Sequence, residues 1–161
     1  MCVIVDTNMI GIDINPKQTN DKEKLEKYEA MKLLRRYIKK RKIKLILPPK
    51  GTDLSDEYKK IEKINEFLNE YKSQEFIETI SIEKFKDAER KLEREKKNYN
   101  IKYKSNKEDF SILVLAKASK TKLLATYDDD LKDDFKNPNV IGGSVYKYKT
   151  QTNLLYKNKC P

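Results

Sequence analysis

The chain has 161 residues, and its 36 Lys and Arg against 26 Asp and Glu give a formal net charge of +10 at pH 7. It contains no histidine, which excludes Ser-His and Cys-His catalysis and histidine-ligated zinc. Two cysteines, Cys2 and Cys160, exclude a disulfide framework and a paired CxxC zinc site, and we expect both to be free thiols. Any hydrolytic chemistry must therefore depend on carboxylates, Lys, Tyr or a bound metal.

The length predicts one compact domain at residues 1–149, followed by a polar tail at residues 150–161. No apolar run approaches the roughly 20 residues of a membrane span, and the first one, residues 3–5, is too short for a signal peptide. We therefore expect a cytoplasmic protein without a membrane segment. The positive charge favours nucleic acid as the partner, with acidic proteins and anionic membranes as open alternatives.

In the first half of the chain, short apolar runs alternate with helical periodicity. Residues 3–5 and 43–47 are typical of buried strands, and residues 21–41 between them carry apolar side chains at helical spacing. A helix is predicted at residues 55–72 and a short strand at residues 76–82. The strand–helix–strand order indicates a parallel sheet.

The second half continues the same alternation. Residues 83–99 predict a helix with a narrow buried face of Phe85, Ala88 and Leu92. Ser105 and Glu108 have the spacing of a capping box, so a helix is predicted to begin there, with an apolar face that includes Leu113. Residues 122–126 predict a further strand, and residues 140–141 a last one.

Three acids occupy the ends of strands or the starts of helices: Asp6, Asp109 and Asp128. Because these positions share one edge of a parallel sheet, the three carboxylates are predicted to converge. Clustered carboxylates repel one another unless a cation neutralises them, and hard oxygen ligands select Mg²⁺ or Mn²⁺. The alternative is structural, since an Asp after a strand is a common turn or N-cap residue. Asp6 follows a buried-type strand and Asp109 precedes an apolar stripe, so both fit that alternative poorly.

The motifs around these acids resemble those of the PIN-domain ribonucleases. Val-Ile-Val-Asp-Thr-Asn at residues 3–8 is similar to the opening motif of that family. Glu-Asp-Phe at residues 108–110 resembles its third acidic motif, and Leu-Ala-Thr-Tyr-Asp-Asp-Asp-Leu at residues 124–131 resembles its last. The second family acid, a Glu soon after the second strand, is best matched by Glu57, with Asp53 and Asp56 as neighbouring alternatives.

The resemblance implies a three-layer α/β/α sandwich around a central, mostly parallel sheet. It also implies a catalytic pocket that binds one or two Mg²⁺ or Mn²⁺ ions and cleaves RNA with a metal-activated water, in a toxin-type or RNA-processing enzyme. The residues that it assigns to catalysis and metal binding are Asp6, Glu57, Asp109 and Asp128. Asp130 would replace or assist Asp128 as a metal ligand, and Asn8 and Thr126 would orient the carboxylates.

Two basic regions are candidates for contacts with single-stranded RNA: residues 39–44, and residues 90–97 with Lys102 and Lys104. Tyr99 and Tyr103 could stack on unpaired bases, although most basic runs are only solvated faces. A non-catalytic RNA-binding or scaffold domain is one alternative. A metal-dependent phosphatase is another, with Asn8 standing where its second Asp belongs. An antitoxin or other protein partner and a homodimer stay open.

Overall fold

A computed structural model describes residues 2–11, 19–41, 43–61, 66, 68–69 and 77–157. Its strands form one sheet in the order β3-β2-β1-β4-β5, and every neighbouring pair is parallel. The strands are β1 (Cys2–Val5), β2 (Lys44–Leu47), β3 (Ile77–Thr79), β4 (Leu123–Ala125) and β5 (Ser144–Tyr146). The prediction of a central parallel sheet is confirmed.

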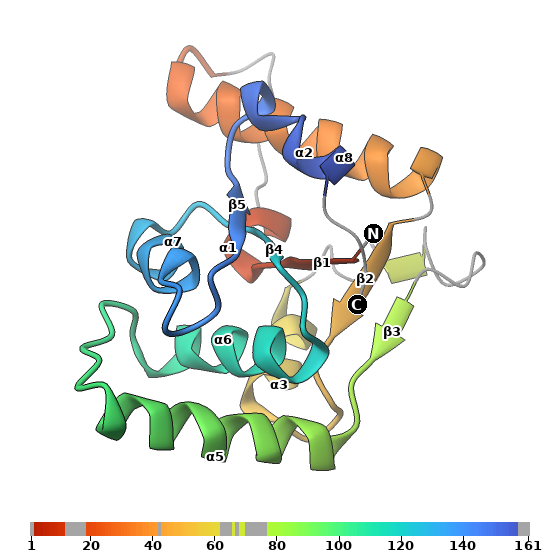
Figure 1. Ribbon diagram of the computed structural model, residues 1–161. Helices are drawn as coiled ribbons and strands as arrows, with labels where there is room; N and C mark the ends of the chain where they lie inside the picture. The colour runs from red at the N-terminus through yellow and green to blue at the C-terminus, as the bar shows by residue number, and fades with distance from the viewer. Residues whose placement is uncertain are drawn as a thin grey trace.

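Helices cover both faces of this sheet (Figure 1), so the chain has an α/β architecture consistent with three layers. One side carries α2 (Lys22–Arg41) and α8 (Leu154–Lys157), and the other carries α5 (Ile82–Asn98) and α6 (Lys107–Ser119). The remaining helices that the structure describes are α1 (Thr7–Ile10), α3 (Asp53–Lys60), α7 (Asp129–Lys136) and the 3₁₀ turn η1 (Lys149–Gln151). Within the described residues, no helix has the length and apolar composition that crossing a membrane requires.

The core lies on both sides of β1, whose four residues are all buried. Helix α6 is buried over five consecutive residues from Ile112 to Ala116, because it lies between the strands and α5 (Figure 1). The sequence predicted burial on one face of α6 only, whereas the structure buries side chains around the whole helix over these five residues. Helix α5 is the outer layer and buries Phe85, Ala88 and Leu92, as its sequence predicts.

The strand order places a reversal of chain direction between β1 and β4. From β1 the chain continues outward through β2 and β3, and it then returns to place β4 and β5 on the other side of β1. A crevice forms at such a reversal, outside the carboxyl ends of the strands, and this is where open α/β sheets bind ligands. The Asp6 N–H donates to the Ala125 carbonyl at 2.8 Å, which holds the ends of β1 and β4 together at this point.

Two predicted elements differ in the structure. Helix α3 ends at Lys60 and Ile61 is extended, so the single helix predicted at residues 55–72 is wrong, and much of its second half lies outside the described residues. The last strand is Ser144–Tyr146 rather than residues 140–141. Residues 140–142 form a turn because their three backbone N–H groups donate to the Asn137 carbonyl. Gly143 then passes so close to Phe135 that a side chain there would clash.

Smaller corrections concern the chain ends and one cap. Cys2 is disulfide-bonded, so the expectation of a free thiol there is wrong, since separation along the chain does not fix distance in the fold. Cys160 lies outside the described residues. The N-cap of α6 is Asn106, not Ser105, and its side chain accepts from the Asp109 N–H. In the predicted tail, Leu155 is buried and α8 contacts β5.

Candidate active site at the ends of β1 and β4

Asp6 is the first residue after β1, and its side chain is only 3% exposed. The Thr126 hydroxyl, from the end of β4, donates to Asp6 Oδ2 at 2.5 Å, and the Thr7 hydroxyl lies 3.3 Å from Asp6 Oδ1. Burial raises the pKa of Asp6 above its ordinary value, against the opposing effect of the Thr126 hydrogen bond. A carboxylate is thus held in one orientation at the reversal point of the sheet.

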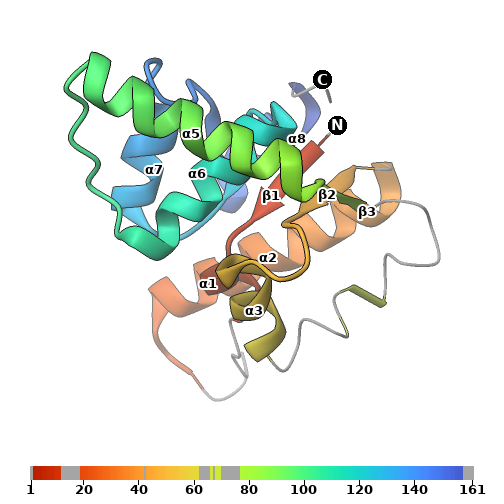
Figure 2. The same ribbon diagram turned by 90° about the horizontal axis from the view of Figure 1, so that it is seen from below.

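Glu57 reaches the same place from α3. The Thr7 hydroxyl donates to Glu57 Oε1 at 2.7 Å, so Thr7 lies between the carboxylates of Asp6 and Glu57. Figure 2 shows α1 and α3 next to each other at the end of β1. The neighbouring Tyr58 is buried, and its hydroxyl donates to the Val5 carbonyl, which fixes the rotation of α3 against β1.

This geometry distinguishes Glu57 from the other two acids of α3. Asp53 and Asp56 are exposed, and Asp56 pairs with Lys59 at 2.8 Å. Glu57 is half-buried and, among these three acids, is the one hydrogen-bonded to the residue that follows Asp6. Asp56, one position before Glu57, points to another face of α3, whereas Asp53 lies on the same face as Glu57 but one turn nearer the start of the helix.

Asp109 lies in the first turn of α6 and is half-buried. Its pKa is raised to about 6, first by burial and then by repulsion from Asp6, Asp128 and Glu57. This repulsion requires that the carboxylates from β1, α3, α6 and the end of β4 share one region of the molecule.

Asp128 has a structural role as well as a place near the others. It is the N-cap of α7, and its Oδ1 accepts from the Leu131 N–H at 2.7 Å. Its own N–H donates to the Thr126 hydroxyl at 3.0 Å. Asn8 completes this network, because its Nδ2 lies 3.4 Å from Thr126 Oγ1 and its Oδ1 accepts from the Tyr127 N–H at 3.2 Å. Thr126 and Asn8 therefore tie the ends of β1 and β4 together through their side chains.

Asp130 lies further from this group. It is exposed in the first turn of α7, and with Asp133, whose carboxylate is the main cause, it raises the pKa of Lys104. Lys104 Nζ and Asp133 Oδ2 are 2.8 Å apart. Asp130 thus acts on the side of α7 that faces Lys104.

The charges around the acids are unbalanced. In the described part of the chain, carboxylates at many other positions form ion pairs with Lys or Arg, as Glu95 does with Lys117 at 2.7 Å. No such pair is formed there by the four acids that converge: Asp6, Glu57, Asp109 and Asp128. In a chain with a net charge of +10, these four acids thus have no ion-pair partner among the residues that the structure describes.

A buried acid elsewhere in the molecule shows the contrast. Asp134 is 5% exposed, and it accepts from the backbone N–H groups of Lys104 and Ser105 and from the Ser105 hydroxyl. These donors satisfy its oxygens and anchor the loop that leads into α6, so no further ligand is needed. Asp6 has hydroxyl donors but lies beside other carboxylates.

A divalent cation fits this cluster by donor type and charge. Carboxylate oxygens are the ligands that Mg²⁺ and Mn²⁺ prefer. Burial is the main reason that the pKa of Asp109 is raised, and a cation would relieve the smaller contribution from repulsion by Asp6 and Asp128. Asp6, Glu57, Asp109 and Asp128 are the residues that would hold it. Within the described residues, no three acidic, His or Cys side chains are already close enough to form a ligand set.

Sequence reasoning missed the bridging role of Thr7 and the anchoring role of Tyr58. Both adjoin a predicted acid, but neither residue type signals a site by itself. Comparisons with protein-family models, curated proteins and solved structures found no match for this chain.

Proposed function

We propose that this chain is a divalent-metal-dependent endoribonuclease of the PIN-like type. The observation that carries the proposal is the convergence of Asp6, Glu57, Asp109 and Asp128 at the reversal point of a parallel sheet, where the described residues provide them with no ion-pair partner. Keeping such a cluster costs stability in the absence of a cation, so it is better explained by metal binding than by folding.

The reaction adds water across a P–O bond of RNA, leaving a phosphate monoester on one fragment and a hydroxyl on the other. When bound, Mg²⁺ or Mn²⁺ lowers the pKa of a water molecule and offsets negative charge on the phosphate. The chain's own residues orient the reactants: Thr126 holds the Asp6 carboxylate and Thr7 holds that of Glu57. Asp109 lies half-buried in the first turn of α6.

A groove of about 750 Å³ adjoins the start of α6 and suits a single strand of RNA. Its lining includes Lys96, Lys102 and Lys107, together with the half-buried rings of Tyr103 and Phe110. The two rings meet edge to face with centroids 5.3 Å apart. Lysines attract phosphates and rings stack on unpaired bases, and this combination is typical of sites for single strands.

The other predicted RNA contacts support the groove less. Lys104 pairs with Asp133, and Arg90 pairs with Asp87. In the run at residues 39–44, Lys44 pairs with Glu78 at 3.6 Å, whereas Lys42 and the side chain of Arg41 lie outside the described residues.

A phosphatase with an Asp nucleophile fits this site less well. Such an enzyme needs a second acid two residues after Asp6, and Asn8 stands there. The Asn8 amide is hydrogen-bonded to the Thr126 hydroxyl and to the Tyr127 N–H, so it holds the ends of β1 and β4 together. A non-catalytic RNA-binding domain is the remaining alternative, and it differs from the proposal in one measurable respect: it binds RNA without cutting it.

The test is cleavage of end-labelled single-stranded RNA with Mg²⁺, Mn²⁺ or EDTA. We expect cleavage that EDTA abolishes, and a loss of at least about 100-fold in Asp6→Asn, Glu57→Gln and Asp109→Asn. Asp53→Asn is the matched control, because it removes a carboxylate from the same helix as Glu57 but lies exposed, and it should cleave normally. Binding without cleavage under every metal condition would support the non-catalytic alternative. Equal activity in all four variants would overturn the site.

A further inference from the structure

A second hollow, of about 810 Å³, lies between α5 and the end of α6. Small side chains such as Ala88 and Ala118 leave the space open, and Ile80 and Ile141 contribute apolar walls. The charged residues that line it are mostly lysines: Lys84, Lys91, Lys117, Lys120 and Lys122, with the acids Glu78 and Asp87. We call this site the lysine hollow.

The acids of the lysine hollow are already neutralised from outside it. Glu78 pairs with Lys44 at 3.6 Å, and Asp87 pairs with Arg90. Lys117 is likewise neutralised, by Glu95 at 2.7 Å. Four uncompensated positive charges remain.

Those four charges have no carboxylate partner within the part of the chain that the structure describes: Lys84, Lys91, Lys120 and Lys122. Lys122 donates to the Ile141 carbonyl, which carries no net charge. All four side chains belong to exposed residues, so an incoming anion can reach them.

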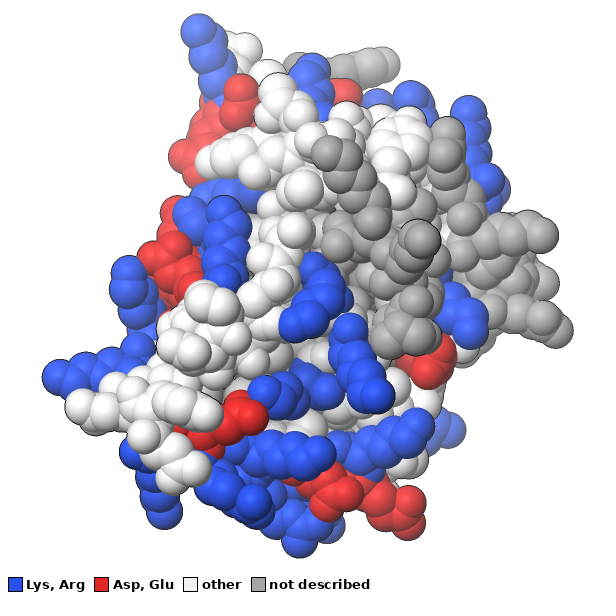
Figure 3. Space-filling model, in the orientation of Figure 1, with Lys and Arg blue, Asp and Glu red and all other residues white. Residues whose placement is uncertain are grey.

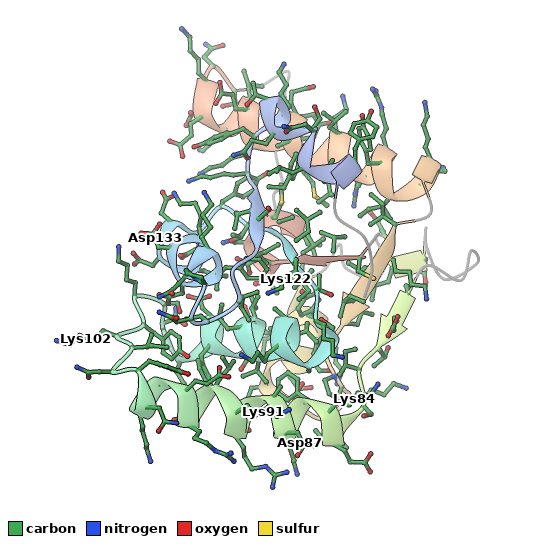
Figure 4. All side chains as sticks on the ribbon, viewed as in Figure 1. Lys84, Asp87, Lys91, Lys102, Lys122 and Asp133 are labelled. Carbon is green, nitrogen blue, oxygen red and sulfur yellow. The ribbon has the colours of Figure 1, made fainter. Side chains whose placement is uncertain are left out.

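The lysine hollow and the acid cluster are at opposite ends of β4. Lys122 directly precedes this strand, whereas Thr126 directly follows it. Lys and Arg side chains gather over α5 in the lower part of Figure 3. Figure 4 shows Lys84 and Lys91 on α5 with Lys122 above them, and Lys102 at the far end of α5. The hollow is thus separate from the groove beside Asp109.

Helix capping explains part of this charge. Lys117 and Lys120 lie at the end of α6, where cations complement the helix dipole. Lys84 lies instead in the first turn of α5, where the dipole disfavours a cation. Lys91 is in the middle of the same helix, on the same stripe as Ala88. The helix dipole therefore does not explain why Lys84 and Lys91 line the hollow.

We propose that the lysine hollow binds the phosphate backbone of helical RNA, away from the site of cleavage. Lys84 and Lys91 are seven residues apart on α5, which separates their backbones by about 10 Å. This spacing lets the two side chains contact different phosphates of one strand. None of the described residues that line the hollow is aromatic, so it offers no surface for stacking on bases and favours backbone contacts.

The choice of RNA over another polyanion rests on the proposed function, and the experiment separates the two. Binding of a fluorescein-labelled RNA hairpin is measured by anisotropy over a range of KCl concentrations. The protein carries Asp6→Asn and EDTA is present, so that the RNA stays intact and binding is measured independently of cleavage. Adding Lys84→Ala and Lys91→Ala should raise the Kd about tenfold and reduce the slope of log K against log salt by about 2.

Lys86→Ala with Arg94→Ala is the matched control, because both residues are exposed on α5 and neither lines either hollow. It removes the same charge from the same helix and should change the Kd less than about threefold. Circular dichroism melts verify that both double variants fold. An equal rise in Kd in both double variants would mean that RNA is attracted only by the overall positive charge, and it would overturn the proposal. Competition by polyglutamate as strong as by unlabelled RNA would overturn the choice of RNA.

Discussion

The two ends of strand β4 differ in the sign of their charges and in burial: the carboxyl end has partly buried acids, and the amino end has exposed lysines. At its carboxyl end lies Asp6, which is 3% exposed and shares its region with carboxylates that form no ion pair within the described residues. At its amino end, an open hollow beside Lys122 is lined by more lysines than acids, and four of these lysines form no ion pair within the described residues. The difference shows that burial, more than the number of charges, decides how strongly like charges affect one another. Water screens the lysines, whereas the acids repel through a partly buried region.

This contrast predicts different responses at the two ends. Divalent metal and pH should act on the acid cluster, because charge there is held at the expense of stability. Monovalent salt should act on the lysine hollow, because exposed charges are screened within about 8–10 Å at ordinary ionic strength. Three experiments test this division.

The largest expected effect is stabilisation by metal. Mn²⁺ at about 100 times its Kd should raise the free energy of unfolding by about 2.7 kcal/mol, which is about 5–10 °C in Tm for a chain of this size. EDTA should reverse the shift. Differential scanning calorimetry measures it, and Asp6→Asn with Asp109→Asn should abolish it while Lys84→Ala with Lys91→Ala should not. A shift that survives loss of both acids would place the metal elsewhere.

Removal of the Thr126 hydroxyl should have an intermediate effect. Thr126→Val leaves the buried Asp6 oxygen without its 2.5 Å donor, which should cost about 1–3 kcal/mol in unfolding and about 10–100-fold in cleavage. Thr126→Ser keeps the hydroxyl and should rescue cleavage. Thr121→Val removes a buried hydroxyl at the other end of β4. It should lower the free energy of unfolding without changing the rate at which the folded enzyme cleaves bound RNA. Similar losses of cleavage in Thr126→Val and Thr121→Val would contradict the expectation that only the carboxyl end of β4 belongs to the site of cleavage.

The smallest effect concerns pH. Asp109 has a pKa of about 6 in the folded protein and about 3.9 when unfolded, so the folded state binds more protons between these values. The resulting stability is full below pH 4 and is lost as the pH rises through 6. In EDTA, Asp109→Asn should therefore gain about 1 kcal/mol relative to the natural protein between pH 4 and 7, with part of the shift screened by solvent. Urea titrations measure this gain, and a difference that is flat with pH would contradict it. Glu108→Gln, exposed on the same turn, is the control.

Much of the fold follows from local patterns that the sequence displays. The helical periodicity of residues 21–41 and 83–99 matches α2 and α5 to within about one residue. The last strand was misplaced because Val140 and Ile141 have strand propensity, but their N–H groups are already bonded to the Asn137 carbonyl. Tertiary contacts overrode propensity in the same way at Ser105, which binds Asp134 instead of capping α6.

The sequence by itself determined which acids are candidates for the site, and that Asp6 and Asp128 follow the ends of strands. Periodicity and residue type are local properties, and they are sufficient for this. The tertiary structure decided that Glu57 is the acid of α3 that lies next to Thr7 and Asp6, because the Tyr58 hydroxyl of α3 binds the Val5 carbonyl and the Thr7 hydroxyl of α1 binds Glu57. It also decided that lysines far apart in the chain enclose one hollow, since α5 and α6 meet only through packing.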